Sequence, residues 1–63
     1  SDVLHTVRKS ADATFDFYLP RGKKEIALQG IEGEPIYLFQ AEAEEQTGSY
    51  TVHRNGVLVV KRA

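Results

Sequence analysis

The chain has 63 residues, of which 41% are hydrophobic and 27% charged, and its net charge is −1. This composition is typical of one small globular domain, here expected over residues 1–63, and excludes disordered and fibrous classes. The near balance of charge argues against a polyanion-binding protein, and no apolar run is long enough to span a membrane. The chain has no Cys, which excludes disulfides and thiolate metal sites. It also has no Met, which leads us to expect a processed chain or a module excised from a longer protein.

The first half of the chain shows the two-residue spacing of β-strands. Residues 3–8 are predicted to form a short first strand, followed by a turn at residues 9–12. In the next segment, 14–19, Phe15, Phe17 and Leu19 share one face, which we expect to point into the core. Asp16 and Tyr18 share the opposite face, which we expect to be exposed.

A hairpin is predicted around the segment Pro20-Arg21-Gly22-Lys23, because Pro and Gly suit a tight turn. The returning strand is residues 24–29. Pairing Phe17 with Ile26 and Phe15 with Leu28 brings apolar side chains together, whereas a shift by one residue would not.

Residues 30–35 contain two Gly and one Pro and are predicted to form a loop. For residues 36–43 helix and strand compete, because residues 41–46 have high helix propensity. The strand is favoured, since the apolar residues scatter around a helical wheel but alternate on a strand. The first half of this strand is apolar on both faces, which predicts a central or doubly covered position.

The dipeptide Asn55-Gly56 lies between two alternating segments, 49–54 and 57–62, and is a strong signal for a two-residue hairpin. Such a loop would place Arg54 opposite Val57 and Val52 opposite Val59. The sequence as a whole therefore predicts an all-β fold with little or no helix. We expect a small antiparallel barrel or sandwich of five to six strands, in a meander, of the size of SH3-like and OB-like barrels.

The residues that carry chemistry form no catalytic or metal-binding pattern. His5 and His53 are 48 positions apart in the sequence and have no metal-ligand spacing, and Ser10 lies in no nucleophile motif. A chain this short also has little material for a water-excluding pocket. The sequence predicts no enzyme activity, no cofactor and no metal site.

Charge is unevenly distributed, with five acids and no base in residues 30–50 and three bases and no acid in residues 51–63. This polarity favours a non-catalytic binding or assembly module that contacts another protein or copies of itself. The alternative is a small nucleic-acid-binding barrel with a basic hairpin tip and an exposed aromatic side chain. The candidate contact residues are Tyr18, Arg21, Lys23, Lys24, Glu42, Glu44, Glu45, Arg54 and Lys61.

Overall fold

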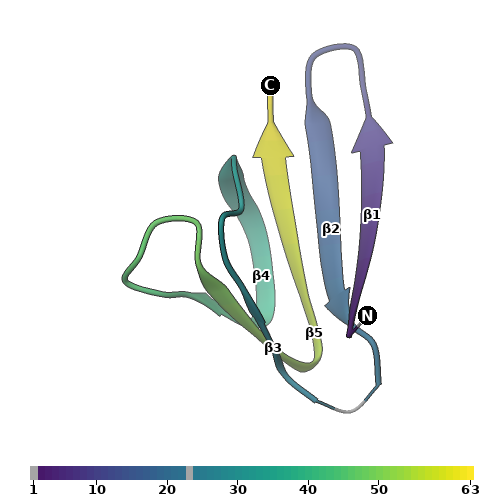
Figure 1. Ribbon diagram of the computed structural model, residues 1–63. Coiled ribbons are helices and arrows are strands. Elements are labelled where there is room, and N and C mark those ends of the chain that lie inside the picture. The colour runs from purple at the N-terminus through teal and green to yellow at the C-terminus, as the bar shows by residue number, and fades with distance from the viewer. Residues whose placement is uncertain (1, 23) are drawn as a thin grey trace.

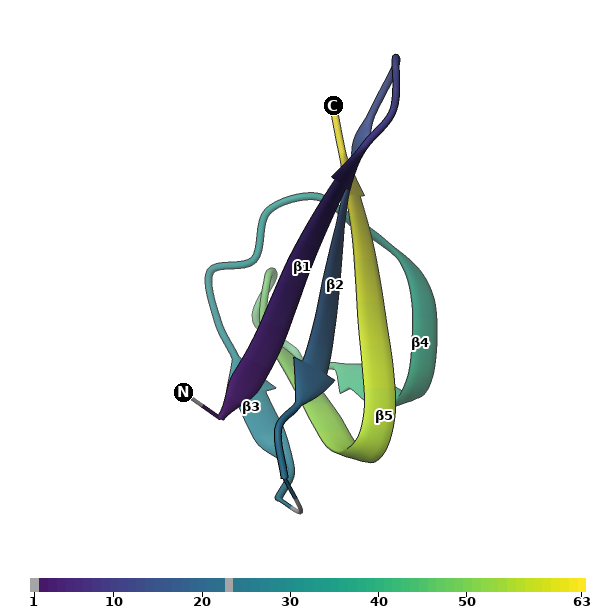
Figure 2. The ribbon, with the colours of Figure 1, turned by 90° about the vertical axis from the view of Figure 1, so that its right-hand side faces the viewer.

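The computed structural model describes residues 2–22 and 24–63. The strands are β1 (Val3–Lys9), β2 (Thr14–Pro20), β3 (Ile26–Leu28), β4 (Glu34–Ala43) and β5 (Tyr50–Arg62), with no helix in the described ranges (Figure 1). Every strand pair is antiparallel. The sheet curls into a half-barrel, seen from the side in Figure 2. The predicted all-β class is confirmed.

Strand β5 is the centre of the fold and belongs to two layers. Its C-terminal half pairs with β2 on one side and β4 on the other, so the first layer has the order β1-β2-β5-β4. Its N-terminal half pairs with β3 and with the C-terminal end of β4, and these three segments form the second layer. The predicted meander is therefore wrong, because β2 pairs with β5 instead of with the next strand in sequence.

The predicted Asn55-Gly56 hairpin is also wrong, because both residues lie inside β5, at the bend between the two layers. Residues 53–56 of β5 lie opposite the single residue Gln40 of β4, which makes a large bulge. Asn55 has a φ of 65° and Gln40 a φ of 49°. A Cβ on Gly56 would approach the Gln40 carbonyl oxygen to 2.4 Å. Asn55 thus adopts the left-handed conformation, and Gly56 allows the close backbone contact. Both properties serve a bend within β5 and not a hairpin turn.

The predicted hairpin between β2 and β3 does not form either. Phe17 pairs with Val59 and Thr6, and Ile26 pairs with Val52. Residues 21–25 instead carry the chain from the first layer to the second, and Lys23 lies outside the described residues. The physical reason is that β5 is a long apolar strand to which both β2 and β3 can pair. A hairpin between β2 and β3 would give neither strand such a partner.

The core lies between the two layers. Leu58 and Val60 contribute from the first layer, and Ile26, Tyr50 and Val52 from the second. Val52, Leu58 and Val60 are fully buried. These five side chains hold the half-barrel together by removing apolar surface from water.

The two faces of β2 are the reverse of those predicted. Tyr18 pairs with Leu58 and Asp16 with Val60, so both point inward, and Asp16 is only 2% exposed. Phe15, Phe17 and Leu19 lie on the outer face and are half-buried. Residues 57–60 of β5 are apolar on both faces, so alternation within β2 alone could not show which side would be covered.

Turns complete the strand connections. The predicted strand 3–8 and the turn after it are confirmed, and the Ser10 amide donates to the Ala13 carbonyl oxygen at 2.9 Å. The strand prediction for residues 36–43 is confirmed as well. The residues after it, 44–49, form a turn in which the Glu44 amide donates to the Ser49 carbonyl oxygen at 2.9 Å.

Candidate functional site

The exposed hydrophobic side chains are concentrated on two strands. In the described part of the chain, every large hydrophobic residue that is exposed lies on β1 or β4. They are Leu4, Val7, Ile36, Tyr37, Leu38 and Phe39. Scattered exposed apolar residues are ordinary on protein surfaces, but concentration on particular elements marks candidate interaction sites.

Strand β4 is an edge of the sheet. Within residues 2–22 and 24–63 it pairs only with β5, so the outward-pointing backbone groups along its other side are available to a further strand. The prediction that its first half is central or doubly covered is wrong. Leu38 illustrates the difference: it is 39% exposed, whereas Leu58, its partner in the register, is fully buried.

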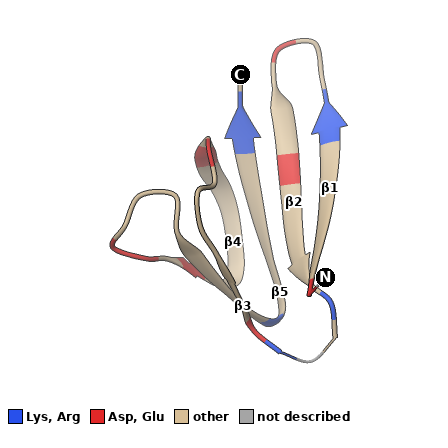
Figure 3. Ribbon diagram, viewed as in Figure 1, with Lys and Arg blue, Asp and Glu red and all other residues tan. Residues whose placement is uncertain are grey.

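Strand β1 is the opposite edge of the same layer (Figure 1). It is hydrogen-bonded to β2 in an uninterrupted antiparallel register, and residues 4–9 are all exposed. Strand β1 contains no acidic residue, and its C-terminal end carries Arg8 and Lys9. Figure 3 shows these bases at the end of β1, at the same end of the layer as the bases that close β5.

The outer face of the first layer connects the two edges. Cross-strand partners share a face, so the register forms a row of Thr6, Phe17, Val59 and Tyr37 from β1 to β4. A shallow pocket of about 450 Å³ lies on this face, lined by Thr6, Arg8, Phe17 and Leu19. The outer face of the second layer is polar by comparison, with Glu42, Thr51 and His53 on it.

A buried carboxylate is held on the inner face. Asp16 accepts hydrogen bonds from Arg62 Nε at 2.5 Å and from His5 Nε2 at 2.7 Å. The hydrogen bonds from the Arg62 guanidinium lower the pKa of Asp16, and burial opposes this effect. The resulting pKa is about 2. Asp16 in turn raises the pKa of Arg62, and burial raises the pKa of Tyr18, whose ring stacks on His5 at 4.3 Å. Both oxygens of the carboxylate are engaged, which suits a structural role.

A second histidine links β5, β4 and the residue before β3 on the polar face. His53 of β5 lies 3.0 Å from Glu42 of β4 and 3.1 Å from Glu25, next to β3. Carboxylates only accept hydrogen bonds, so both contacts form together when the ring is the imidazolium. Glu42 first, and then Glu25, raise the pKa of His53.

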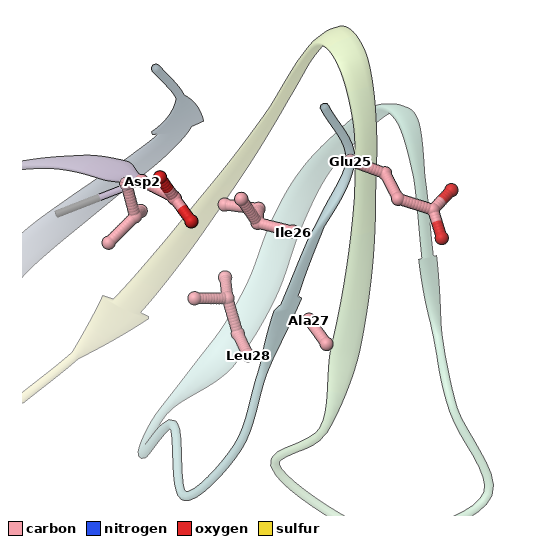
Figure 4. Close-up of a pocket in the computed structure, with 6 residues that line it drawn as sticks. Asp2, Glu25, Ile26, Ala27 and Leu28 are labelled. Atoms are coloured by element: carbon pink, nitrogen blue, oxygen red, sulfur yellow. The ribbon is translucent and has the colours of Figure 1, made fainter. Parts of the chain in front are cut away.

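A second pocket, of about 330 Å³, opens where β1 and β3 are not hydrogen-bonded to each other. Figure 4 shows Ile26 and Leu28 pointing toward Asp2 in this gap, while Glu25 points away from it. The half-barrel is therefore open along this seam. No group of three or more His, Cys, Asp or Glu residues is placed to hold a metal ion in the described ranges.

The sequence-predicted contact residues do not form one site. Lys24 and Arg54 lie at the same end of the sheet, because their sequence neighbours Glu25 and His53 are in contact. Lys61 lies near the other end of β5, opposite Glu34 of β4. Tyr18 is half-buried rather than exposed. The other acids and bases lie on the surface at Arg21, Glu42, Glu44 and Glu45, and Lys23 is outside the described residues.

Sequence reasoning missed the strongest feature, the exposed apolar edges. The signal was present in residues 36–39, which are apolar on both strand faces, but it was interpreted as burial.

No protein-family model matches this chain. No helix in the described residues has the length and apolar character needed to cross a membrane.

Proposed function

We propose that this chain is a non-catalytic binding and assembly module that acts through protein–protein contacts, and that its contact sites are the free edges of β1 and β4. The observation that carries the proposal is the placement of all six exposed large hydrophobic residues of the described chain on these two strands. Edge strands bind other polypeptides by adding a strand to the sheet. Backbone hydrogen bonds supply affinity in that mode, and alternate side chains supply specificity.

The structure of β4 suits strand addition. It runs for ten residues, and its bulges at positions 36 and 40 bend it around the half-barrel. Natural proteins usually protect such an edge with charges, Pro, a bulge, a short strand or a covering loop. On β4 the charges, the Pro and the two bulges flank the run Tyr37, Leu38 and Phe39, and within this run there is none of these.

Peptide binding tests the proposal. Peptides of twelve residues selected from a random displayed library should bind the ¹⁵N-labelled chain and shift amide signals of residues 4–9 or 34–43. The Phe39→Lys variant should lose this binding, because it places a charge among the exposed apolar side chains. Gln29→Lys, which adds the same charge at an exposed loop residue outside the strands, should bind as the parent chain does.

Two outcomes would refute the proposal. One is that the selected peptides shift signals only away from the two edges. The other is that labelled single-stranded DNA or RNA binds at 50 mM salt around Arg21, Lys24 and Arg54 while no peptide binds. Electrostatic binding to phosphates is strongest at low salt, so this condition gives the nucleic-acid alternative its best chance.

A further inference from the structure

The two free edges are arranged so that one can pair with the other on a neighbouring copy. Strand β1 is antiparallel to β2, β2 to β5, and β5 to β4, so β1 and β4 run in opposite directions at the two ends of one layer. A second copy placed beside the first, with the same face outward, therefore presents its β1 antiparallel to β4. The layer would continue across the junction without reversing a strand.

Charge favours this unlike pairing over pairing of like edges. Strand β4 carries Glu34 and Glu42 and no base, whereas β1 carries Arg8 and Lys9 and no acid. Two β4 edges paired antiparallel bring Glu34 of one copy beside Glu42 of the other, which is unfavourable between neighbouring strands. Two β1 edges paired antiparallel place their bases at opposite ends and gain no attraction between opposite charges. A β1 edge against a β4 edge brings opposite charges together.

The faces of the strands select one register. Leu4, Thr6 and Arg8 lie on the outer face with their partners on β2, and Tyr37 lies on the same face through Val59. Placing Thr6 of one copy opposite Tyr37 of the next puts Leu4 opposite Phe39, with all four side chains on the outer face. The bulge at Ile36 shifts the pairing beyond it by one residue, so that Glu34 and Arg8 share the outer face there. The same register brings Glu34 beside Arg8 and Lys9. A shift of two residues in either direction breaks the apolar match or leaves Glu34 without a base from the neighbouring copy.

We propose that copies of this chain associate head to tail by pairing β1 of one copy with β4 of the next, with Thr6 opposite Tyr37. This inference rests on the proposed function and names a second copy as the partner. Such a contact is heterologous: it leaves one free β1 and one free β4 on every pair, so association continues until the copies close a ring or extend as a filament.

The surface available sets the strength of a junction. The six exposed side chains, at roughly 200 Å² each when fully accessible and 39–52% exposed, offer about 500 Å² of apolar area. With the usual share of polar area this is an interface of about 900 Å², in the size range of weak, transient contacts. A single junction is therefore expected to be weak, with each closed ring stabilised by all its junctions together.

Cysteine pairing tests the register, since the chain has no Cys of its own. Thr6→Cys and Tyr37→Cys are made as separate proteins and mixed under mild oxidation. Directly opposed residues on antiparallel strands have Cα atoms about 4.5–5.5 Å apart, which suits a disulfide. Within one chain these positions are three strand spacings apart, about 14 Å, which is too far.

The expected product of the mixture is the Thr6→Cys/Tyr37→Cys heterodimer, in excess over either homodimer, and the double variant should give a ladder of covalent multimers. A control pair, Thr6→Cys with Gln29→Cys, should give no enriched heterodimer, because Gln29 is an exposed loop residue outside the strands. Disulfides mainly between two Tyr37→Cys chains would overturn the proposal in favour of a symmetric β4 pair. A strict monomer by light scattering at 500 µM, with no enriched heterodimer, would overturn self-association.

A charge variant tests the same junction without crosslinking. Arg8→Glu should weaken association measured by sedimentation about three- to tenfold, because it places an acid beside Glu34. Gln29→Glu also adds an acid, at an exposed loop residue outside β1 and β4, and should leave association unchanged. Equal effects of the two would contradict the β1–β4 junction. If self-association fails while library peptides still bind β1 or β4, the partner is another protein and the proposed function stands.

Discussion

Asp16 of β2 and Arg62 of β5, separated by 46 positions in the sequence, are joined by two hydrogen bonds, from Arg62 Nε to one carboxylate oxygen and from its Nη2 to the other. Asp16 is buried, but the Arg62 side chain is 43% exposed. The pair therefore ties the last strand to the first hairpin across the inner face, and its cost in lost hydration falls mainly on the carboxylate.

Replacing this carboxylate should destabilise the fold. We expect Asp16→Asn to lower the free energy of unfolding by about 2 kcal/mol, because it leaves the guanidinium without its buried counter-charge. Urea unfolding followed by circular dichroism measures the change. Asp12→Asn, in the exposed turn between β1 and β2, is the matched control and should change stability by less than about 0.5 kcal/mol. Equal effects of the two substitutions would show that the buried pair contributes nothing.

Stability should also fall in acid. The pKa of Asp16 is about 2 in the folded chain, against the ordinary value of 3.8 for an aspartate side chain in water, so the unfolded chain binds a proton at a higher pH than the folded one. Its contribution, about 2 kcal/mol, is complete above pH 4 and is lost as the pH falls toward 2. Urea midpoints at pH 5, 4, 3 and 2 would show this decline. In Asp16→Asn the decline should be smaller, and an identical decline in both proteins would assign it to other carboxyls.

The opposite pH dependence is expected from His53. Its pKa is raised in the folded chain above the ordinary value of 6.5 by Glu42 and Glu25. The protonated ring therefore stabilises the fold fully below pH 6.5, and this contribution is lost as the pH rises through the folded pKa. The urea midpoint should decrease slightly between pH 6 and 8, and this decrease should disappear in His53→Gln. A midpoint that is flat in the parent chain over this range would contradict the expectation.

The bend in β5 should be sensitive to a single methyl group. A Cβ at position 56 would meet the carbonyl oxygens of Gln40 and Phe39 at 2.4 and 2.7 Å. Gly56→Ala should therefore cost about 2–3 kcal/mol of stability, because two backbones must separate. Gly22→Ala is the control: Gly22 has a φ of 87° but open space around it, so only the cost of a left-handed residue, about 1 kcal/mol, is expected. Denaturant unfolding of both variants compares the two costs.

The sequence by itself determined the all-β class and the position of β1, β2 and β4, and it favoured a strand over a helix for residues 36–43, whereas residues 41–46 stayed open between a strand and a helical turn. These follow from local terms: a spacing of two residues over 14–19 and 36–43, and a serine suited to the turn at position 10. The same terms could not decide the pairing. Asn55-Gly56 has the local sequence of a hairpin turn, yet in the structure it lies in the bulge opposite Gln40 of β4, where β5 bends.

Only the tertiary structure decided which faces are covered. Phe15 and Phe17 have the pattern of core residues but lie outside, and Asp16 has the pattern of a surface residue but is 2% exposed, because Arg62 and His5 satisfy its charge. The residues 36–39 are apolar on both sides yet lie on a free edge. Alternation specifies that a strand has two different faces, whereas the partners of β5, distant in sequence, determine which face meets the core and which edge stays available for binding.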